Sequence, residues 1–539
     1  MKSVFSLLIV LLCMSQLAHA QAVTDTTASD TMKLVEIINA DKNGFKRIDS
    51  VTELQILVGH AIIKQGSTTF YFDSAVYNKR LKTVEAFGNI HINDRDSIHT
   101  YSQYLLYHTD TKVAFLKKKV KLTDNKSTLY TEDLVYDINQ KLGEYKNGGR
   151  VVNGSSVLTS KEGTYYADLK DIYFKRNVKL KDPKYNLETD SLLYNTNSEI
   201  ATFIDRTKIV DSSKREIITR EGFYDLKNKK AVFGKRPTIK DGATQITAND
   251  ITTDDETGIS ILKGNAVYKD TAQGVAVLAN LIEANKKEGN FRATLNPLMI
   301  IKQEEDSIYI AADTLFSGKL SKLGKDSTVL KDTIKGKVVI TKDSINNNDS
   351  TDRYFKAYRN VRIFSDSLQA VADSLFYSGK DSIFRLMQKP IVWGNTGQIT
   401  GDTILLYTKN KKADKMEVFE KGMLISDAGS GLYNQIKGNR IYAYFKEGNL
   451  DYVRAKGNAE SIYIITDDKD SSLIGINRAT GDIIDLRFVE KKVNRVVFVN
   501  DVKGTMYPIK QVPEESKRLP NFQWHEKRRP KTKYELFGE

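Results

Sequence analysis

Aspartate is the residue type whose spacing in this sequence could most readily support chemistry. A series of aspartates recurs just before hydrophobic strand-like segments, and repeated carboxylates could bind calcium or supply an acid–base pair for glycoside cleavage. The sequence lacks the glycine-rich nonapeptide of calcium-binding β-rolls, and an aspartate at the start of a strand more often caps a turn. We therefore interpret these residues as turn caps, with no pair singled out for catalysis. They are Asp73, Asp133, Asp190, Asp250, Asp313, Asp373 and Asp402.

Histidines could indicate a metal centre, because three of them, His91, His99 and His108, fall within about twenty residues. Their spacing does not place them on one face of a strand, so we predict structural or surface histidines and no bound metal or cofactor. No phosphate-binding loop, nucleophile elbow or His-Glu-x-x-His motif is present. We expect a non-enzymatic protein; a β-helical polysaccharide-degrading enzyme would need clustered acids and bases on one exposed face.

The chain repeats a strand–turn–strand unit of about thirty residues, and this repeat must position every other feature. Apolar and charged residues alternate within each unit, and turn residues return every ten to fifteen residues or so, which predicts short antiparallel strands. The expected fold is all-β, an elongated, solenoid-like stack of antiparallel rungs. The first apolar residues of successive units, 27 to 32 apart, are Ala61, Ile90, Val120, Val151, Val178, Ile209, Ile239, Ala266 and Leu298, and the series resumes at Val361, Ile391, Met423 and Ala459.

The N-terminus has the pattern of a cleaved signal peptide: Lys2, an apolar run from Val4 to Leu12, and a small-x-small site ending at Ala20. Cys13, the only cysteine, lies in this segment, so we expect an exported mature protein without disulfides. The predicted organisation is a signal peptide (1–20), a polar leader (21–52), a first β-module (53–317), a polar insertion or linker (318–352), a second β-module (353–506) and an irregular C-terminal tail (507–539).

The chain carries 82 Lys and Arg against 68 Asp and Glu, a formal net charge of +14. Nucleic acid is not an expected partner, because an exported chain without an aromatic–basic recognition motif does not fit one. Anionic lipid or phosphorylated glycan suits the charge, although exposed basic residues also keep strands soluble and unpaired. The first candidates for contacting anionic headgroups are Lys117, Lys118, Lys119 and Lys121.

Aliphatic residues of the repeat form a column that would line the interior. Two interpretations stay open: facing sheets close on one another as an ordinary sandwich core, or they stay apart and hold acyl chains. The candidate groove residues are Ile90, Ile92, Val120, Leu122, Val178, Leu180, Ile209, Ile239, Val361 and Ile363.

The element Gly88-Asn89-Ile90, followed by variations on Asp-Ser-Leu-x-Tyr such as Asp190–Tyr194, resembles the OstA-like family of periplasmic lipopolysaccharide-transport proteins. The resemblance runs over most of 55–317 and resumes in 353–485. It implies a twisted, V-shaped β-jelly roll, here as two stacked modules, whose apolar interior shields lipid A acyl chains. It also implies modules that join end to end through sheet edges.

The resulting hypothesis is a non-enzymatic periplasmic bridge or chaperone in lipopolysaccharide transport to the outer membrane, which would hold acyl chains in its apolar groove. It would associate with the inner face of that membrane. Its partners would be lipopolysaccharide and other bridge components, and end-to-end homo-oligomers are left open. The alternative is a closed-core β-solenoid that acts as an envelope scaffold or binds glycans, with Tyr101, Tyr104 and Tyr107 as an aromatic platform.

Overall fold

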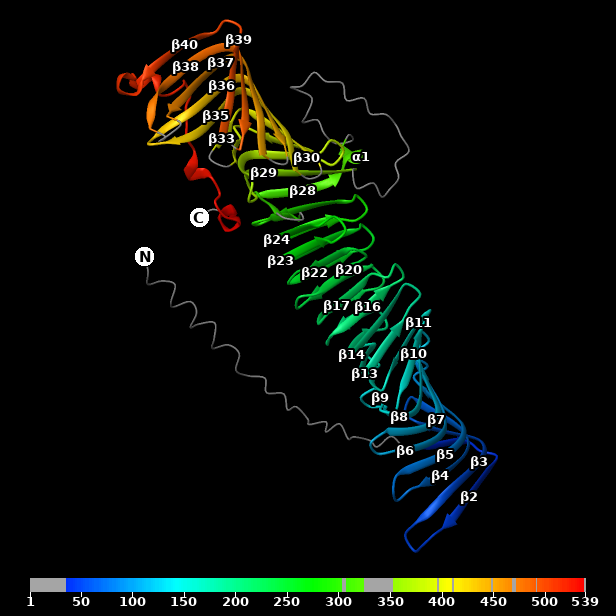
Figure 1. Cartoon of the computed structure of the whole chain (residues 1–539). Helices are drawn as coiled ribbons and strands as arrows, with labels where there is room; N and C mark the ends of the chain where they lie inside the picture. The colour runs from blue at the N-terminus through cyan, green and yellow to red at the C-terminus, as the bar shows by residue number, and fades with distance from the viewer. Residues whose placement is uncertain are drawn as a thin grey trace, which may run out of the picture. The chain divides into compact units, whose positions relative to one another are not determined.

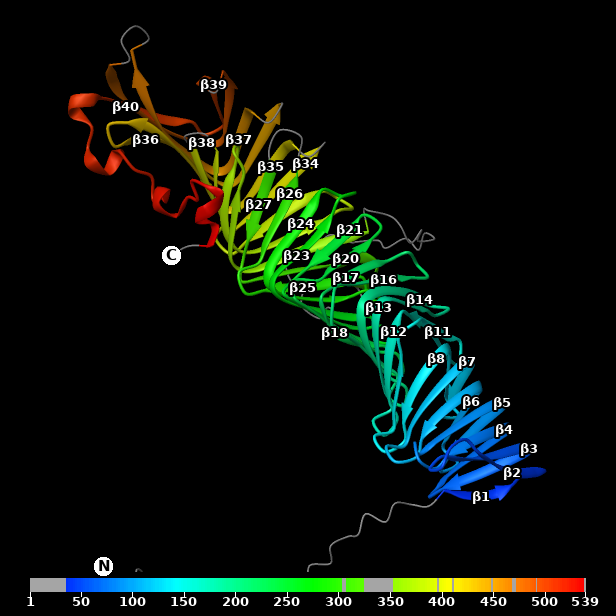
Figure 2. The same cartoon turned by 90° about the horizontal axis from the view of Figure 1, so that it is seen from below.

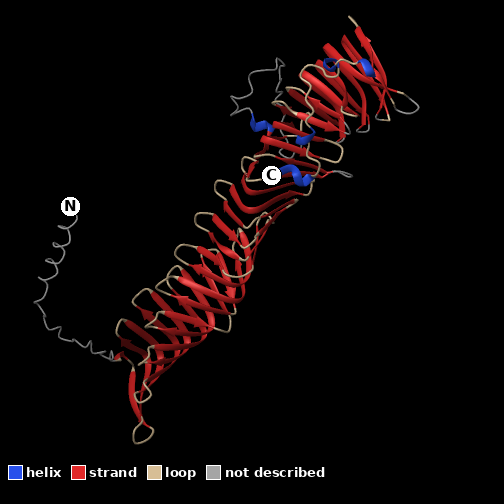
Figure 3. Ribbon diagram, turned by 90° about the vertical axis from the view of Figure 1, so that its left-hand side faces the viewer, coloured by secondary structure: helices blue, strands red, loops and turns tan. Residues whose placement is uncertain are grey.

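The computed structural model describes residues 35–302, 307–323, 352–394, 397–409, 412–446, 449–467, 472–490 and 492–537. The signal peptide predicted for 1–20 lies outside these residues. Almost every described element is a β-strand (Figure 3), and neighbouring strands pair antiparallel, as in β5 with β6 and β13 with β14. The prediction of an all-β, repeat-built stack of antiparallel strands is therefore confirmed. The chain divides into two compact units, the first ending at Gly143 and the second beginning at Glu144, and each is described by itself.

The first unit consists of strands that pair in chain order (Figure 1). Its strands are β1 (Glu36–Asn39), β2 (Lys42–Arg47), β3 (Glu53–Gln65), β4 (Thr68–Asn78), β5 (Thr83–Asp94), β6 (Ile98–His108), β7 (Val113–Thr123) and β8 (Ser127–Asp137), and β9 (Leu142–Tyr145) contains the boundary. Strands β1 and β2 lie within the segment assigned to a polar leader; both are exposed along their whole length and pair with β3, which explains their weak apolar pattern.

The second unit is also a ladder of strands, with shorter strands at first and long ones toward its end (Figure 2). Its strands begin with β10 (Gly149–Asn153), β11 (Ser156–Ser160), β12 (Glu162–Tyr166), β13 (Asp171–Lys181), β14 (Tyr185–Asn195), β15 (Ile200–Phe203), β16 (Thr207–Asp211), β17 (Glu216–Thr219), β18 (Glu221–Asp225), β19 (Lys230–Gly234), β20 (Thr238–Asp241), β21 (Thr244–Thr247), β22 (Asp250–Asp254), β23 (Ile259–Asp270), β24 (Val275–Asn285), β25 (Asn290–Thr294), β26 (Leu298–Lys302), β27 (Ser307–Ala311) and β28 (Thr314–Lys319), which leads into the helix α1 (Leu320–Leu323).

After residue 351 the ladder resumes, and β28 pairs directly with β29, so that Lys319 lies opposite Arg353. The division into a first module (53–317) and a second module (353–506) remains a prediction. The remaining elements are β29 (Arg353–Phe364), β30 (Gln369–Ser378), β31 (Ile383–Met387), β32 (Ile391–Gly394), β33 (Gly397–Thr400), β34 (Thr403–Lys409), β35 (Lys412–Gly429), β36 (Leu432–Lys446), β37 (Asn449–Thr466), β38 (Leu473–Val489), β39 (Lys492–Val499), β40 (Lys503–Pro508) and the 3-10 helices η1 (Ile509–Gln511), η2 (Glu514–Ser516), η3 (Glu526–Arg528) and η4 (Lys533–Phe537).

A bulge near the middle of the long strands bends them and divides each unit into two facing walls. In β5 the register with β6 shifts between Phe87 and Ile90, across Gly88 and Asn89, which both have left-handed backbone (φ +73° and +38°). Only glycine and asparagine adopt this conformation readily. We call the line of bulges the corner. Wall A contains segments such as 83–87 and 104–108, and wall B contains segments such as 90–94 and 98–102.

The C-terminal segment 509–537, called the strap, crosses the outer face of wall B in the second unit and is red in Figures 1 and 2. The amide of Gln435 donates to the Lys517 carbonyl (2.8 Å) and accepts from the Leu519 N–H (2.8 Å). The amide of Gln398 likewise donates to the Gln523 carbonyl (2.8 Å) and accepts from the His525 N–H (2.7 Å). These amides satisfy strap backbone groups that would otherwise be buried without partners.

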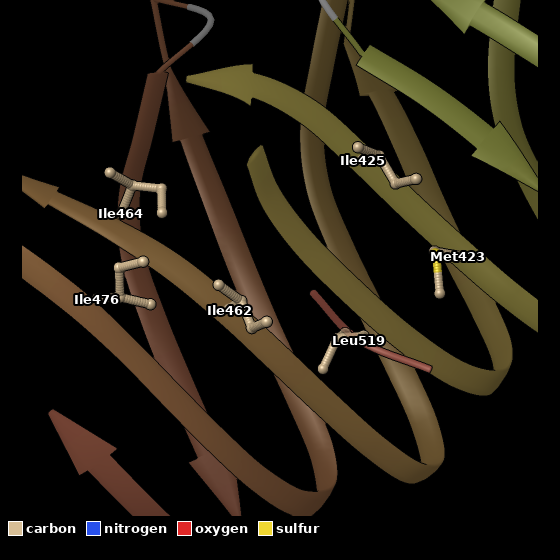
Figure 4. Close-up of a cluster of buried hydrophobic side chains, with 6 residues drawn as sticks. All are labelled: Met423, Ile425, Ile462, Ile464, Ile476 and Leu519. Atoms are coloured by element: carbon tan, nitrogen blue, oxygen red, sulfur yellow. The ribbon is translucent and has the colours of Figure 1, made fainter. Parts of the chain in front are cut away.

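Beneath the strap, wall B is apolar on both faces, because Gly422 to Ile425 are all buried. Leu519 of the strap packs into the outer cluster shown in Figure 4. The cluster consists of Met423, Ile425, Ile462, Ile464, Ile476 and Leu519, with Tyr433, Phe522 and Trp524 packed around it. The irregular tail predicted from the sequence therefore covers a second apolar layer that the repeat pattern does not reveal.

Candidate functional site: a packed trough between two walls

All ten predicted groove residues point into the space between the walls and are buried, with at most 7% of their surface exposed. In the second unit, Leu180 lies opposite Leu187, and Leu187 in turn lies opposite Ile209. The next rungs continue the column through Ile217, which lies opposite both Ile209 and Ile239. The structure thus brings the predicted residues together through partners such as Leu187 and Ile217. The sequence analysis missed these partners because it followed only the first strand of each unit.

Polar side chains opposite the bulges hold the corner. Asn89 donates its side-chain amide to Asp73 (2.9 Å), and Asn360 does the same to Asp313 (3.0 Å). Asp190 accepts the backbone N–H of Asn177 (3.4 Å). These aspartates accept hydrogen bonds from a bulge on the neighbouring strand. Asp73 and Asp190 lie in the middle of β4 and β14, so the expectation that they start a strand and cap its turn is wrong for these two. Among the described residues, no group of three or more His, Cys, Asp or Glu is arranged to hold a metal ion.

A line of hydroxyl groups on the inner side of the corner was missed by the sequence analysis. Each hydroxyl donates to the backbone carbonyl two residues further along, across the bend between the walls. The residues are Ser102, Thr131, Ser160, Thr189 and Thr219, at spacings of 29, 29, 29 and 30. Their spacing is the repeat period itself, so a search for polar residues at that period would have found them.

The free ends of the two walls meet along a line that we call the seam. In the first unit, Gln65 of wall B donates to the carbonyl of Thr109 (2.9 Å) and accepts the hydroxyl of Tyr107, both in wall A. The rings of Phe70 and Tyr107 also meet across the interior, with centroids 4.6 Å apart. The interior of this unit is therefore packed.

In the second unit, polar and aromatic pairs join the same two wall ends. Asn153 donates to the Tyr194 hydroxyl (3.0 Å), and the rings of Tyr185 and Tyr224 lie 5.6 Å apart. Burial raises the pKa of Tyr224 to about 12, helped by the nearby charge of Asp255. It follows that this phenol is neutral at physiological pH and acts as a donor.

Two ion pairs extend this seam. Arg215 contacts Asp255 (3.6 Å), and Lys286 contacts Asp241 (2.9 Å). The Lys286–Asp241 pair is well exposed, and exposed pairs contribute little to stability. The contacts that hold the seam are side-chain contacts, whereas the backbone itself joins the walls at the corner.

A small cavity lies behind this seam. Its volume is about 10 Å³, no more than one water molecule needs. Its lining combines aliphatic and polar side chains: Val151, Asn153, Ser156, Leu158, Leu180, Tyr185, Tyr194 and Leu226.

The four candidate headgroup lysines lie at the corner and on the parts of both walls next to it. Lys118 and Lys119 occupy the bulge of β7, with left-handed backbone, and Lys121 lies on the outer face beside the Tyr101 ring (5.4 Å). Lys117 lies opposite Asp133 in the register of β7 and β8. They are thus remote from the seam, and their role toward anionic headgroups stays a prediction.

The aromatic platform suggested for glycan binding does not form. Tyr107 is buried in the interior (1% exposed), whereas Tyr101 and Tyr104 face outward. Tyr101 stacks on His91 with ring centroids 4.5 Å apart, and His91 bonds to His99 (3.1 Å). Since alternate residues of a strand face opposite sides, Tyr104 and Tyr107 could not share a face.

Comparison with known proteins finds a family that is similar to the first part of the chain. The model of a family described as OstA-like protein matches residues 32–190 and 186–249. This part of the chain is OstA-like. The resemblance drawn from the sequence is therefore confirmed over 32–249, and for the remaining residues it stays a prediction.

Solved structures are also similar to this chain. A crystal structure of LptH, described as the LptA-homologous periplasmic component of the lipopolysaccharide transport device of Pseudomonas aeruginosa, is 13% identical. It aligns with 28% of this chain and 97% of that chain, at a TM-score of 0.15. No curated protein matches. No helix among the described residues is long and apolar enough to cross a membrane.

Proposed function

We propose that this protein is a periplasmic component of a lipopolysaccharide-transport bridge that receives acyl chains between its two walls. The OstA-like match over 32–249 and the buried aliphatic residues between the walls of each unit support this role. Neighbouring bridge components would pair with exposed strands at the ends of the ladder, since unpaired N–H and C=O groups there can bind another sheet. No covalent chemistry is required of the protein in this role.

The observation that carries the proposal is the difference between the two edges of the trough. Continuous strands join the walls at the corner, whereas pairs such as Asn153–Tyr194 and Asp241–Lys286 hold the seam. The walls can therefore separate about the corner without breaking a strand. An acyl chain would then replace the wall-to-wall contacts, gaining about 0.8 kcal/mol for each buried methylene group.

Photo-crosslinking in cells tests this proposal. A photoreactive residue at Ile92 or Leu180 points into the trough, whereas one at the neighbouring position His91 or Lys179 points outward from the same strand. We expect lipopolysaccharide adducts from the two inward positions and none from the two outward controls. Adducts absent from both inward positions, in chains that fold and are exported, would overturn the proposal.

A second candidate function is a closed-core envelope scaffold. The complete burial of the column and the seam contacts favour it, because the inner faces touch in this structure. In that case the interior would stay inaccessible: an inward photoreactive group would label only the protein itself, while depletion of the protein would still weaken the envelope.

A further inference from the structure

The cavity behind the seam of the second unit contains a hydroxyl group without a partner. Tyr185 lines the cavity, and among the described residues its hydroxyl oxygen is fully buried and makes no hydrogen bond. A buried hydroxyl without a partner is unfavourable, so such a group calls for an explanation. Burial also raises the pKa of Tyr185, which keeps the proton on the oxygen and the group a donor.

The other cavity residues define what this donor could bind. Val151, Leu158, Leu180 and Leu226 supply an aliphatic floor, and no lysine or arginine belongs to the lining. A phosphate or a free carboxylate would be desolvated there without a counter-charge, which is strongly unfavourable. A neutral acceptor attached to an alkyl chain meets both requirements: the carbonyl of an acyl ester or amide.

We propose that this cavity is the place where the carbonyl group of an entering acyl chain binds, with the Tyr185 hydroxyl as its donor. This inference rests on the function proposed above and names the residue that would recognise the acyl chain. The alkyl part would extend along Leu158 and Leu180, into the aliphatic column. Because the cavity holds at most one water molecule, the Asn153–Tyr194 hydrogen bond at the seam must open to admit the chain.

Two uncharged detergents of equal chain length separate the carbonyl from the alkyl contribution: a sucrose ester of dodecanoic acid and dodecyl maltoside, which has no carbonyl. Binding to the full chain below the critical micelle concentration would be measured by calorimetry. We expect the ester to bind about fivefold more tightly than the maltoside, because one additional hydrogen bond increases affinity by about this factor.

The Tyr185→Phe variant should lose this preference while binding dodecyl maltoside as before. It removes only the oxygen that has no partner, so the variant should be at least as stable as the parent chain. The matched control is Tyr166→Phe, since Tyr166 is 39% exposed on β12 and lies outside the cavity lining. This control should retain the preference.

The outcomes distinguish this inference from the proposed function. Equal binding of the two detergents by the parent chain, or a preference that survives in Tyr185→Phe, would overturn the carbonyl site and leave acyl binding in place. Failure of both detergents to bind, together with no crosslinking from Leu180, would overturn the proposed function as well.

Discussion

Lys286 and Asp241 form an ion pair, 2.9 Å between Nζ and Oδ2, that joins the free ends of the two walls in the second unit. Asp241 ends β20 in wall B, and Lys286 follows the part of β24 that lies in wall A, so this contact spans the opening through which an acyl chain would have to pass. The pair therefore offers a direct way to lock the trough.

Locking the seam should prevent acyl chains from reaching the column. Cysteines introduced by Asp241→Cys and Lys286→Cys, in a Cys13→Ser background, would be bridged by a short bis-thiol reagent. We expect lipid crosslinking from Leu180 to fall to the level of the Lys179 control. The matched double variant is Lys230→Cys with Asp254→Cys, an ion pair (3.7 Å) whose strands both belong to wall A. Bridging this second pair should leave crosslinking unchanged; equal losses in both variants would refute gating at the seam.

The corner bulge should be sensitive to a side chain at Gly88. A Cβ atom there would lie 2.3 Å from Oδ2 of Asp73, on a backbone with φ +73°. Gly88→Ala should cost about 1–2 kcal/mol from the left-handed backbone, and more from displacing Asp73. Hydrogen exchange of β4 and β5 under increasing urea would measure the local loss. Gly44→Ala is the control, because no atom lies within 4 Å of its added Cβ and it should change little.

The strap should detach when one of its glutamine anchors is removed. Gln398→Ala leaves the Gln523 carbonyl and the His525 N–H without their side-chain partner, at about 1–3 kcal/mol for each buried group. Limited proteolysis should then cut within 509–537 roughly tenfold faster, since cleavage follows the population of the opened state. Gln245→Ala, at an exposed position of β21, should leave the cleavage rate unchanged. Equal rates in the two variants would mean that Gln398 does not anchor the strap.

Stability of the first unit should decrease in mild acid because of His91. Burial, followed by the proximity of His99, lowers the pKa of His91 below its ordinary value of 6.5. A lowered pKa in the folded state means that the unfolded chain takes up the proton first. The contribution of neutral His91 is therefore complete above about pH 6.5 and is lost as the pH falls from there toward the lowered folded value. Urea unfolding at several pH values would show this slope, and His91→Gln should flatten it.

The regular part of the fold could be predicted from the sequence because each unit repeats the same alternation. Val178 and Leu180 alternate with charged residues, and both lie in the interior as expected. The closure of the walls could not be predicted, since it depends on contacts such as Gln65–Thr109 between residues 44 positions apart that have no periodic signature. A column of Ile and Leu gives the same sequence pattern whether it faces another wall or a lipid.

The packing of the strap on wall B could not be predicted for a related physical reason. Met423 and Ile425 belong to the outer face, where earlier rungs carry polar residues, so the run from Gly422 to Ile425 gives no alternation to interpret. The partner that buries this face is an irregular, proline-containing segment, and its own sequence shows no strand or helix period. Its anchors are buried amides, which a scan for charged or catalytic residues passes over.

Arg362 donates to the carbonyl of Glu535, 173 positions later in the chain. Rungs that contact only their neighbours can form one after another during synthesis. The outer face of wall B is buried only after the last residues of the chain have been made. During synthesis it would expose Ile462, Ile464 and Ile476 to other chains. A chaperone that binds exposed aliphatic surface would be needed at this stage. A chain truncated before Leu519 would keep this surface exposed and would stay bound to the chaperone.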